Sequence, residues 1–535
     1  MRHFTETSDD WAVIKFDISN AYGSLPRRFI ELCLSSADPT LRQYFRFVCG
    51  SPSPIALFGP DDTSFVSLGE GVKQGDATSS LIYCLTQDIA LTDIQTTLNA
   101  HQIPFDPYSF MDDLTICCKS CDVDFIVTTV TTAFLSIGLT INADKSRILT
   151  PTASTFSIPS SPITDPFIVL GTNISPAPMA YTKFVSKLIE RQKTYFDLFL
   201  RTSLHPHVKA TLLRLCGHPR ILYHCATTPP AHMAPVAKYF DRRVHKMVEL
   251  LIDPSGDTMV PLSAIHDDGG AGAPSYSAHL NEIYGAYRTM ALEHNPATPR
   301  LQLTTRAETT ASAAQVDSQW LFFEATNYLT PHQFAIAFAI RLGVLPNYAR
   351  LHDTKCNCGY VYTREHNTTI DHVLTCDMAT HVTHTTRHNM VRDAIIQTAR
   401  YYGVTTTKEP TCFTYADGRH HRPDAMFHTL PNNLVIDVSL VSTHPAQESI
   451  TNAEQQKFNT HLEATRCQSC VFFPFVMATR GTLGTQAEKF IRTLIKTVQP
   501  HMQYYFRRSL AHAVASAAAR GRADAISAAA MRTRW

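Results

Sequence analysis

The stretch that decides the fold is Tyr108-Ser109-Phe110-Met111-Asp112-Asp113-Leu114-Thr115-Ile116, in which two carboxylates stand between short apolar runs. The runs predict two strands, and the Asp pair predicts the turn that joins them. Two adjacent carboxylates at an exposed turn repel each other unless a cation lies between them, and oxygen ligands suit Mg²⁺ or Mn²⁺. The turn is therefore a candidate for half of a two-metal phosphoryl-transfer site. An isolated Asp-Asp pair is also an ordinary turn, because Asp is favoured there.

A second carboxylate upstream favours the metal site. Asp17 directly follows Ala12–Phe16, a nearly continuous apolar run that predicts a strand buried on both faces. A carboxylate at the end of a buried strand needs a partner, and a metal ion is a good one.

Three further segments lie around this pair. Gly71–Ser80 is a glycine-bearing loop before a helical pattern that starts with Leu81, Leu85 and Ile89, and Asp76 and Thr78 to Ser80 could cap the first turn. Ile137–Ser146 follows a helical stretch that Gly138 is expected to end. Phe167–Gly171 predicts an apolar strand closed by glycine.

In order and spacing these five segments resemble motifs A to E of reverse transcriptases, and Asn20–Arg27 is similar to the non-LTR retrotransposon branch. The resemblance implies a palm built from an antiparallel sheet with helices. It implies that Asp17 and Asp112 ligate two Mg²⁺ ions, with Asp113 in support.

The resemblance also assigns the nucleotide pocket. Tyr22 resembles the aromatic steric gate that excludes a ribose 2′-OH, and Gln74 and Gly75 would shape the nucleotide and template pocket. Lys145 would be the cation near the triphosphate and a general acid for the leaving pyrophosphate. Taken alone, Lys145 is equally compatible with a solvated loop lysine.

Two features depart from the family pattern. Ala77 stands where the family usually has proline after the Gly-Asp of motif B. Motif A begins near residue 17, so no room precedes it for the fingers segments, and we expect a chain without that N-terminal part. The alternative function is then a truncated, catalytically impaired nucleic-acid-binding remnant. A viral RNA polymerase is a third reading, which Phe110-Met111 and the nuclease segment described below argue against.

Downstream, two tight pairs of residues predict a zinc site. Cys356 and Cys358 form a Cys-x-Cys turn, and His372 and Cys376 are spaced to share one face of a helix. Zn²⁺ takes four such ligands in a tetrahedron. Free thiols beside a chance histidine are the alternative. The set also resembles the Cys-Cys-His-Cys knuckle of retroelements that carry a restriction-like endonuclease.

A second acidic site follows the knuckle. Asp424 lies in Arg422-Pro423-Asp424, and Asp437 lies inside the apolar run 434–441, a predicted buried strand. The pattern resembles the PD-(D/E)xK nuclease core, in which two carboxylates hold Mg²⁺ and a lysine stabilises or activates the attacking water. Because Ser439 occupies the usual lysine position, Lys457 from the following helix fits the displaced lysine of the retroelement branch.

The 535 residues exceed one core and predict several domains. We expect an α+β multidomain chain: a reverse transcriptase palm lacking most of the fingers, a helical thumb and connector, a zinc knuckle, an α/β PD-(D/E)xK-like nuclease and a basic Ala/Arg-rich helical tail. Their expected ranges are 1–178, 179–345, 346–395, 396–500 and 501–535. Gly269–Gly272 predicts a flexible turn rather than a phosphate cradle, and 296–315 predicts a linker.

Composition adds few constraints. The net charge is only +1, but from Ile491 to Trp535 there are eight Lys or Arg and one acid. The tail could bind phosphates or simply pack on the nuclease. No signal peptide or membrane-spanning run is visible, and the 14 scattered Cys favour a reducing, intracellular setting. The expected location is the nucleus.

The implied activity is an RNA-directed DNA polymerase coupled to DNA nicking for target-primed reverse transcription. Its expected cofactors are Mg²⁺ (or Mn²⁺) and Zn²⁺, and its expected partners are an RNA template, target DNA and dNTPs.

Overall fold

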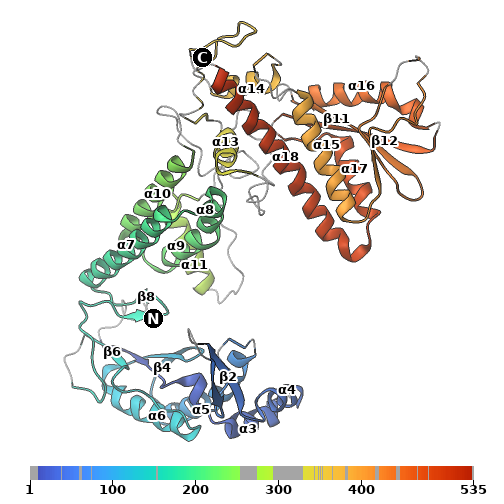
Figure 1. The fold of residues 1–535 in the computed structure, drawn as a ribbon. Coiled ribbons are helices and arrows are strands. Elements are labelled where there is room, and N and C mark those ends of the chain that lie inside the picture. The colour runs from blue at the N-terminus through green and yellow to red at the C-terminus, as the bar shows by residue number, and fades with distance from the viewer. Residues whose placement is uncertain are drawn as a thin grey trace. The chain divides into compact units, whose positions relative to one another are not determined.

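The computed structural model divides into two compact units, Met1–Glu190 and Arg191–Trp535 (Figure 1). Both units combine helices with strands, in agreement with the expected α+β class. The structure describes residues 10–37, 39–58, 63–73, 75–76, 78–151, 155–252, 274–292, 329–342, 344–346, 349, 351, 353–363, 366–376, 378–379, 384–415, 418, 421–441, 446–466, 468–479 and 481–532.

The first unit is built on an antiparallel sheet with the strand order β4-β5-β1-β6. Two small hairpins, β2–β3 and β7–β8, accompany it. Its elements are β1 (Ala12–Phe16), α2 (Ala21–Ser24), α3 (Arg27–Ala37), α4 (Pro39–Cys49), β2 (Ser53–Phe58), β3 (Thr63–Leu68), α5 (Ser79–Ala100), β4 (Phe105–Phe110), β5 (Asp113–Cys118), α6 (Val123–Ser136), β6 (Arg147–Leu149), β7 (Ile168–Val169), β8 (Thr172–Asn173) and α7 (Pro178–Arg201), which crosses into the second unit.

Strand β1 is buried on both faces, as the sequence predicts, except at the half-buried Lys15. Side chains alternate along a strand, so Ile14 and Phe16 join the core shared with α3, α5 and α6. Trp11 and Val13 face the other way and pack with Phe167 of the segment that leads into β7. The helices therefore cover one face of the sheet, and the β7–β8 segment covers part of the other.

The helix end at Gly138 is confirmed: α6 ends at Ser136, and Gly138 has a φ of +80°. The predicted apolar face of α5 is wrong at Leu81, whereas Leu85 and Ile89 pack against the core as expected. Leu81 is 52% exposed, whereas Ile82 and Tyr83 are buried. The periodicity starting one residue later is the one that packs on α3 and α6.

The second unit begins with helices and ends with a mixed sheet of strand order β12-β11-β10-β9, in which β11 and β12 are parallel. Its elements are α8 (Pro206–Leu212), a π-helical turn (Leu213–Gly217), α9 (His218–Thr227), α10 (Pro230–Ile252), α11 (Leu280–Leu292), α13 (Pro331–Arg341), α14 (His366–Thr375), α15 (His384–Tyr401), β9 (Thr406–Lys408), β10 (Ala425–Phe427), β11 (Asn433–Val441), α16 (Ala446–Arg466), β12 (Cys470–Ala478), α17 (Thr485–Lys496) and α18 (Gln503–Arg532).

The C-terminal helix packs against the rest of the second unit, which is one of the two alternatives that the sequence left open for the tail. The tail is helical as expected, but α18 is largely buried and passes alongside α15 and past α13 and α14 (Figure 1). Phe506 joins the core of the sheet, Ala515 the core around α13, and Ile526 the core around α14. Small side chains allow this close packing. Helix α18 (Gln503–Arg532) is therefore packed into the second unit along most of its length.

One predicted boundary falls inside an element. The division between knuckle and nuclease at residue 395 lies within the single helix α15, which packs on both α18 and β11. The predicted loop at Gly269–Gly272 and linker at 296–315 lie outside the described residues. Among the helices that the structure describes, none combines the length and apolarity needed to cross a bilayer.

Candidate functional sites

Strand pairing brings two acidic residues to the same end of the first unit's sheet. Strands β1 and β5 pair with Phe16 opposite Leu114, so the same register brings Asp17 opposite Asp113. Asp112 directly precedes Asp113 and lies in the two-residue turn between β4 and β5, where Met111 has a φ of +55°. The fold therefore delivers Asp17 and Asp112 from neighbouring strands to the same end of the sheet.

Asp113 lies beside a lysine. The Lys15 Nζ lies 3.7 Å from the Asp113 Oδ1 and donates to the carbonyl oxygen of Ile168 at 3.3 Å. Both side chains are partly exposed, so the pair contributes at most about 1 kcal/mol to stability. Its larger effect is orientation, because Lys15 connects the turn carboxylate to the β7 strand. This arrangement fits the supporting role expected of Asp113.

Tyr22 is held close to this turn by α5. Its ring stacks on Tyr83 with the centroids 4.6 Å apart, and its hydroxyl donates to the Ser80 Oγ at 3.4 Å. Burial raises the pKa of Tyr83, and the nearby charge of Asp112 raises it further. Tyr83 is thus a residue of this site that the sequence reading missed, because it was outside the apolar face assigned to α5.

The glycine loop before α5 is fixed against the turn that carries Tyr22. Gly71 has a φ of +67°, and a Cβ there would lie 2.6 Å from the Gly23 carbonyl carbon. The Val72 N–H donates to the Tyr22 carbonyl oxygen at 2.8 Å. Only glycine fits this close approach of two backbones. Gly75 follows with a φ of +89°, whereas Gln74 and Ala77 lie outside the described residues.

The predicted capping of α5 takes a different form. The Asp76 Oδ1 accepts the Thr78 N–H at 2.8 Å and the Thr78 hydroxyl at 2.7 Å, and these bonds lower the pKa of Asp76. Thr78 itself makes no side-chain cap.

Lys145 belongs to a loop that holds the backbone of Asp17 from both sides. The Asn142 N–H donates to the Asp17 carbonyl oxygen at 2.7 Å, and the Asp17 N–H donates to the Ser146 Oγ at 3.0 Å. Lys145 lies one residue before Ser146 and is exposed. The exposed side chain of Lys145 therefore belongs to the loop that fixes the backbone of Asp17, the candidate metal ligand.

The four residues of the candidate zinc site converge. Their ligand atoms all lie within 4.8 Å of one another, and within the described ranges they are the one such Cys/His/Asp/Glu set of three or more. The Cys356 and Cys376 sulfurs are 3.8 Å apart, and the Cys358 sulfur is 3.5 Å from the His372 Nε2. Zn–S bonds of about 2.3 Å and a Zn–N bond of about 2.05 Å in a tetrahedron give edges of about 3.8 Å and 3.6 Å. These residues fit Zn²⁺.

Local structure explains this convergence. The Cys356 N–H donates to the Tyr360 carbonyl oxygen at 2.8 Å, which closes the Cys-x-Cys turn. The Tyr360 ring stacks on the His372 imidazole at 3.9 Å and fixes its plane. Helix α14 supplies His372 and ends just before Cys376.

The second acidic site lies in the mixed sheet. Asp424 directly precedes β10, and Asp437 lies within β11; each is 6% exposed. The Asp424 N–H donates to the Ile436 carbonyl oxygen at 3.0 Å, and the Val438 N–H donates to the Asp424 Oδ2 at 2.5 Å. The strand pairing therefore fixes the two carboxylates relative to each other.

Helix α16 brings two nitrogen donors to Asp437. The Lys457 Nζ lies 2.6 Å, and the His461 Nε2 3.0 Å, from the same oxygen, Oδ2. An ionised carboxylate can only accept, so the His461 Nε2 that faces Asp437 carries a proton, and the Tyr415 hydroxyl lies 2.7 Å from the His461 Nδ1. The expected approach of Lys457 to Asp437 is thus present in the geometry.

Asp424 has partners from α15. The His388 Nε2 lies 2.8 Å, and the Arg392 Nη1 3.8 Å, from the Asp424 Oδ1. Arg392 is 4% exposed and also bonds Glu409 at 2.7 Å. The sequence pattern did not predict that His388, Arg392, Tyr415 and His461 belong to this site. The four-residue spacings between His388 and Arg392, and between Lys457 and His461, were the available signal.

The surroundings of Asp424 and Asp437 shift their pKa values in opposite directions. Burial raises the pKa of Asp424, and the hydrogen bond with His388 offsets only part of that increase. Burial alone would also raise the pKa of Asp437, but its bond with His461, the neighbouring Asp424 and the Lys457 charge hold it well below the usual range. Paired carboxylates with diverging pKa values are typical of acid–base and metal chemistry.

Comparison with known proteins defines the class of the first unit. Residues 2–199 match the family described as reverse transcriptase (RNA-dependent DNA polymerase). This match covers the sheet edge with Asp17 and Asp112, the glycine loop and the β7–β8 hairpin. The chain therefore contains a reverse transcriptase domain.

A curated relative extends the likeness across the chain. Over 518 residues the chain is 22% identical to the retrotransposable element SLACS 132 kDa protein of Trypanosoma brucei gambiense, which supports a retroelement reverse transcriptase. The match covers 90% of this chain but 42% of the relative, so the chain spans less than half of that protein's length.

Among solved structures, telomerase from Candida albicans, in complex with a TWJ fragment of telomeric RNA, is 13% identical over 56% of this chain and 53% of its own, with a TM-score of 0.23. Telomerase from Candida tropicalis, in the same kind of complex, is 12% identical over 55% and 48%, with a TM-score of 0.26. At these TM-scores the likeness says nothing further about the fold.

Proposed function

We propose that this chain nicks DNA and extends the freed end by copying RNA, as the non-LTR retrotransposon protein of target-primed reverse transcription. The observation that supports the polymerase is the strand register that brings Asp17 and Asp112 to the same end of the sheet inside the reverse transcriptase domain. The observation that supports the nuclease is the buried pair Asp424 and Asp437 with Lys457 against it. We propose that both reactions occur in the nucleus, on chromosomal target DNA.

In the nuclease step, water attacks a DNA phosphorus and the P–O3′ bond breaks, leaving a 3′-OH and a 5′-phosphate. Asp424 and Asp437 would hold Mg²⁺ (or Mn²⁺), which supplies charge stabilisation to the attacking and leaving oxygens. Lys457 places a positive charge beside this pair, where it can orient the water or stabilise the charge that develops on phosphate. His461 contacts the Asp437 Oδ2, and Tyr415 contacts His461, so this pair orients the Asp437 carboxylate.

In the polymerase step, the 3′-OH attacks the α-phosphorus of a dNTP and pyrophosphate leaves. Asp17 and Asp112 would hold the metal ions there. Tyr22, stacked on Tyr83, would contact the sugar and exclude a 2′-OH. Lys145 would donate a proton to the pyrophosphate oxygen.

The candidate zinc set has a structural part in this proposal. Cys356, Cys358, His372 and Cys376 would hold Zn²⁺, which fixes the segment packed between α13 and α18. Structural zinc of this kind stabilises small folds that lack a large core.

One set of variants tests both activities. Primer extension on an RNA template should fail in Asp112→Asn and persist in Asp144→Asn, whose exposed acid lies in the Lys145 loop. Nicking of supercoiled plasmid should fail in Asp424→Ala and persist in Glu463→Gln, an exposed acid on α16. Nicking by Asp424→Ala would refute the nuclease assignment, and extension by Asp112→Asn would refute the polymerase assignment. If the wild-type chain binds nucleic acid but does neither reaction, it is a binding protein.

A further inference from the structure

Positive charge is concentrated near the C-terminus. The whole chain has a net charge of +1, yet residues 489–523 contain seven Lys or Arg and no Asp or Glu. Arg522 is 2% exposed and donates to the Thr479 carbonyl oxygen, so it serves the fold. Lys489, Arg492, Lys496, Arg507 and Arg508 are exposed. A polyanion is the natural partner of such a surface.

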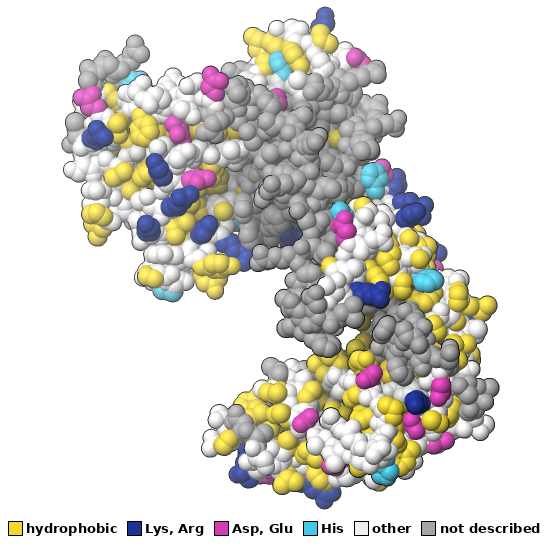
Figure 2. Space-filling view, turned by 180° about the vertical axis from the view of Figure 1, so that it is seen from behind, with side chains coloured by type: hydrophobic (Ala, Val, Ile, Leu, Met, Phe, Trp, Pro, Cys, Tyr) yellow, Lys and Arg dark blue, Asp and Glu magenta, His cyan; other side chains and the backbone are white. Residues whose placement is uncertain are grey.

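Exposed aromatic rings accompany these cations. Tyr401 is 84%, Tyr504 66% and Tyr505 58% exposed. A tyrosine that leaves most of its ring in water forgoes the stabilisation of burial, and several such rings together indicate a binding surface. Figure 2 shows dark blue and yellow side chains gathered at the lower end of the body that contains α17 and α18.

Contacts bring the end of α15 to the first turns of α18. The Tyr402 hydroxyl lies 2.9 Å from the Ser509 Oγ, and the Tyr402 ring is 5.1 Å from Phe506, which fixes the end of α15 against the first turns of α18. Tyr401, the preceding residue, therefore lies beside those turns. Lys496 ends α17, and only six residues separate it from the first residue of α18. We name Tyr401, Lys496, Tyr504, Tyr505, Arg507 and Arg508 the α17–α18 surface.

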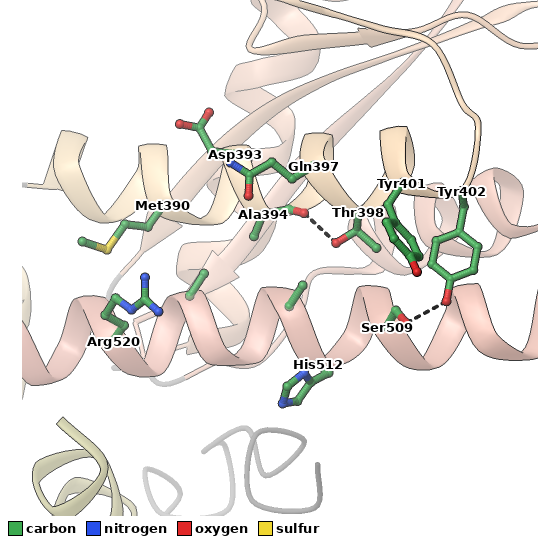
Figure 3. Close-up of a pocket in the computed structure, with 12 residues that line it drawn as sticks. Met390, Asp393, Ala394, Gln397, Thr398, Tyr401, Tyr402, Ser509, His512 and Arg520 are labelled. Atoms are coloured by element: carbon green, nitrogen blue, oxygen red, sulfur yellow. Dashed lines mark hydrogen bonds between the residues drawn. The ribbon is translucent and has the colours of Figure 1, made fainter. Parts of the chain in front are cut away.

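A groove leads away from this surface. A cavity of about 730 Å³ lies between α15 and α18, within the range of ligand pockets. Tyr401 and Tyr402 point down from α15 at one end, and Arg520 projects from α18 toward α15 at the other (Figure 3). Asp393, which lines the cavity, forms ion pairs through its Oδ1 with the Arg392 Nε at 2.9 Å and the Lys408 Nζ at 3.0 Å. Gln397 and Thr398 offer hydrogen-bonding groups between the two ends.

We propose that the α17–α18 surface binds single-stranded nucleic acid, with unpaired bases stacked on the tyrosines and phosphates held by Arg507, Arg508 and Lys496. An aromatic ring can stack only on a base whose face is open, which a duplex does not provide along its length. The groove would receive a base displaced from the strand, with Arg520 at its far end. This binding needs neither metal ions nor cleavage, so it stands apart from the proposed nuclease activity.

The test is fluorescence anisotropy of the full chain with labelled 15-nucleotide single strands of DNA and RNA and with the DNA duplex, all in EDTA. Single strands should bind tighter than the duplex. Tyr504→Ala and Tyr505→Ala together should weaken single-strand binding about tenfold or more. Arg507→Gln with Arg508→Gln should lower the slope of log affinity against log salt by about 1.4, because each phosphate contact contributes about 0.7. The matched controls, Leu430→Ala (93% exposed) and Arg466→Gln, should bind like the wild type.

Each outcome decides the proposal. An unchanged affinity and salt slope in the tyrosine and arginine variants would overturn it. An arginine effect without a tyrosine effect, with duplex bound as tightly as single strand, would overturn the single-strand assignment. Comparison of the DNA and RNA arms shows which strand is preferred. Because these residues are exposed, circular dichroism of each variant should match the wild type.

Discussion

Replacement of His461 by phenylalanine tests how the nuclease-like site holds its carboxylate ionised. His461 is 3% exposed, and its Nε2 lies 3.0 Å from the Asp437 Oδ2, the oxygen that Lys457 also contacts. Phenylalanine fills similar space beside Phe472, whose ring centroid lies 5.2 Å from that of His461, but it cannot donate a hydrogen bond. Asp437 then keeps Lys457 and loses one buried donor.

The size of the effect follows from that one bond. A hydrogen bond to a charged group contributes about 1.5–3 kcal/mol. One pKa unit corresponds to about 1.36 kcal/mol, so the pKa of Asp437 should rise by about one to two units in the variant. Asp437 has a depressed pKa in the folded state. Its contribution to stability is therefore complete above the unfolded pKa of about 4 and is lost as the pH falls through the folded value. His461→Phe should unfold more easily at pH 7, by about 1.5–3 kcal/mol, and this deficit should shrink as the pH falls through the folded pKa of Asp437 in the variant.

Two measurements check this reasoning. Urea unfolding in EDTA at several pH values gives the stability difference without any activity. The rate of plasmid nicking at pH 7 should fall. His461→Gln, which can still donate, should recover part of both effects, and Tyr415→Phe should give a smaller change. A deficit that is equal at every pH, with no recovery in the glutamine variant, would refute the role assigned to this hydrogen bond.

Three further predictions follow from single contacts. Asp112→Asn should lower primer extension by more than about a hundredfold with an unchanged melting temperature, since mutation of even the outer partners of a metal costs about ten- to a hundredfold; retained extension would contradict the site. Cys358→Ser should lower the zinc content, measured by mass spectrometry, from one per chain toward zero and lower the melting temperature; full zinc retention would contradict the ligand set. Gly71→Ala should destabilise by about 1–3 kcal/mol in urea unfolding, whereas Gly69→Ala, with no atom within 4 Å of the added carbon, should not; equal effects would contradict the close approach to the Tyr22 turn.

Strand-borne features could be predicted from the sequence. The buried run Ala12–Phe16 and the Asp112-Asp113 turn appear where the pattern placed them, because alternation and turn chemistry are local properties. The Cys356 to Cys376 set also converges as expected, since each of its pairs is fixed by one turn.

Partners contributed by other elements could not be predicted. Tyr83 was missed because two helical faces, offset by one residue, are both apolar in α5, and only the packing of α3 and α6 selects between them. His388 and His461 lie far from their carboxylates in the sequence, and nothing local marks either as a neighbour. The Ala-rich composition of α18 predicted a helix correctly, but burial along α15 depends on shape, as at Gly521, where an added Cβ would lie 3.0 Å from the Arg387 Cγ.

In both acidic sites, the positions of the aspartates can be predicted from the sequence more reliably than the positions of the lysines that accompany them. Asp17 and Asp437 are each fixed by strand register, and a register follows from the pattern of buried residues. Their cations come from elsewhere: Lys145 from a loop that closes on Asp17, and Lys457 from a helix laid across β11. A lysine at any of several positions along a helix or loop can reach the same carboxylate oxygen, so sequence spacing predicts its position only weakly. The contact that fixes Lys457 is its bond to the Asp437 Oδ2, an oxygen that His461 also contacts, and it becomes visible only in the folded chain.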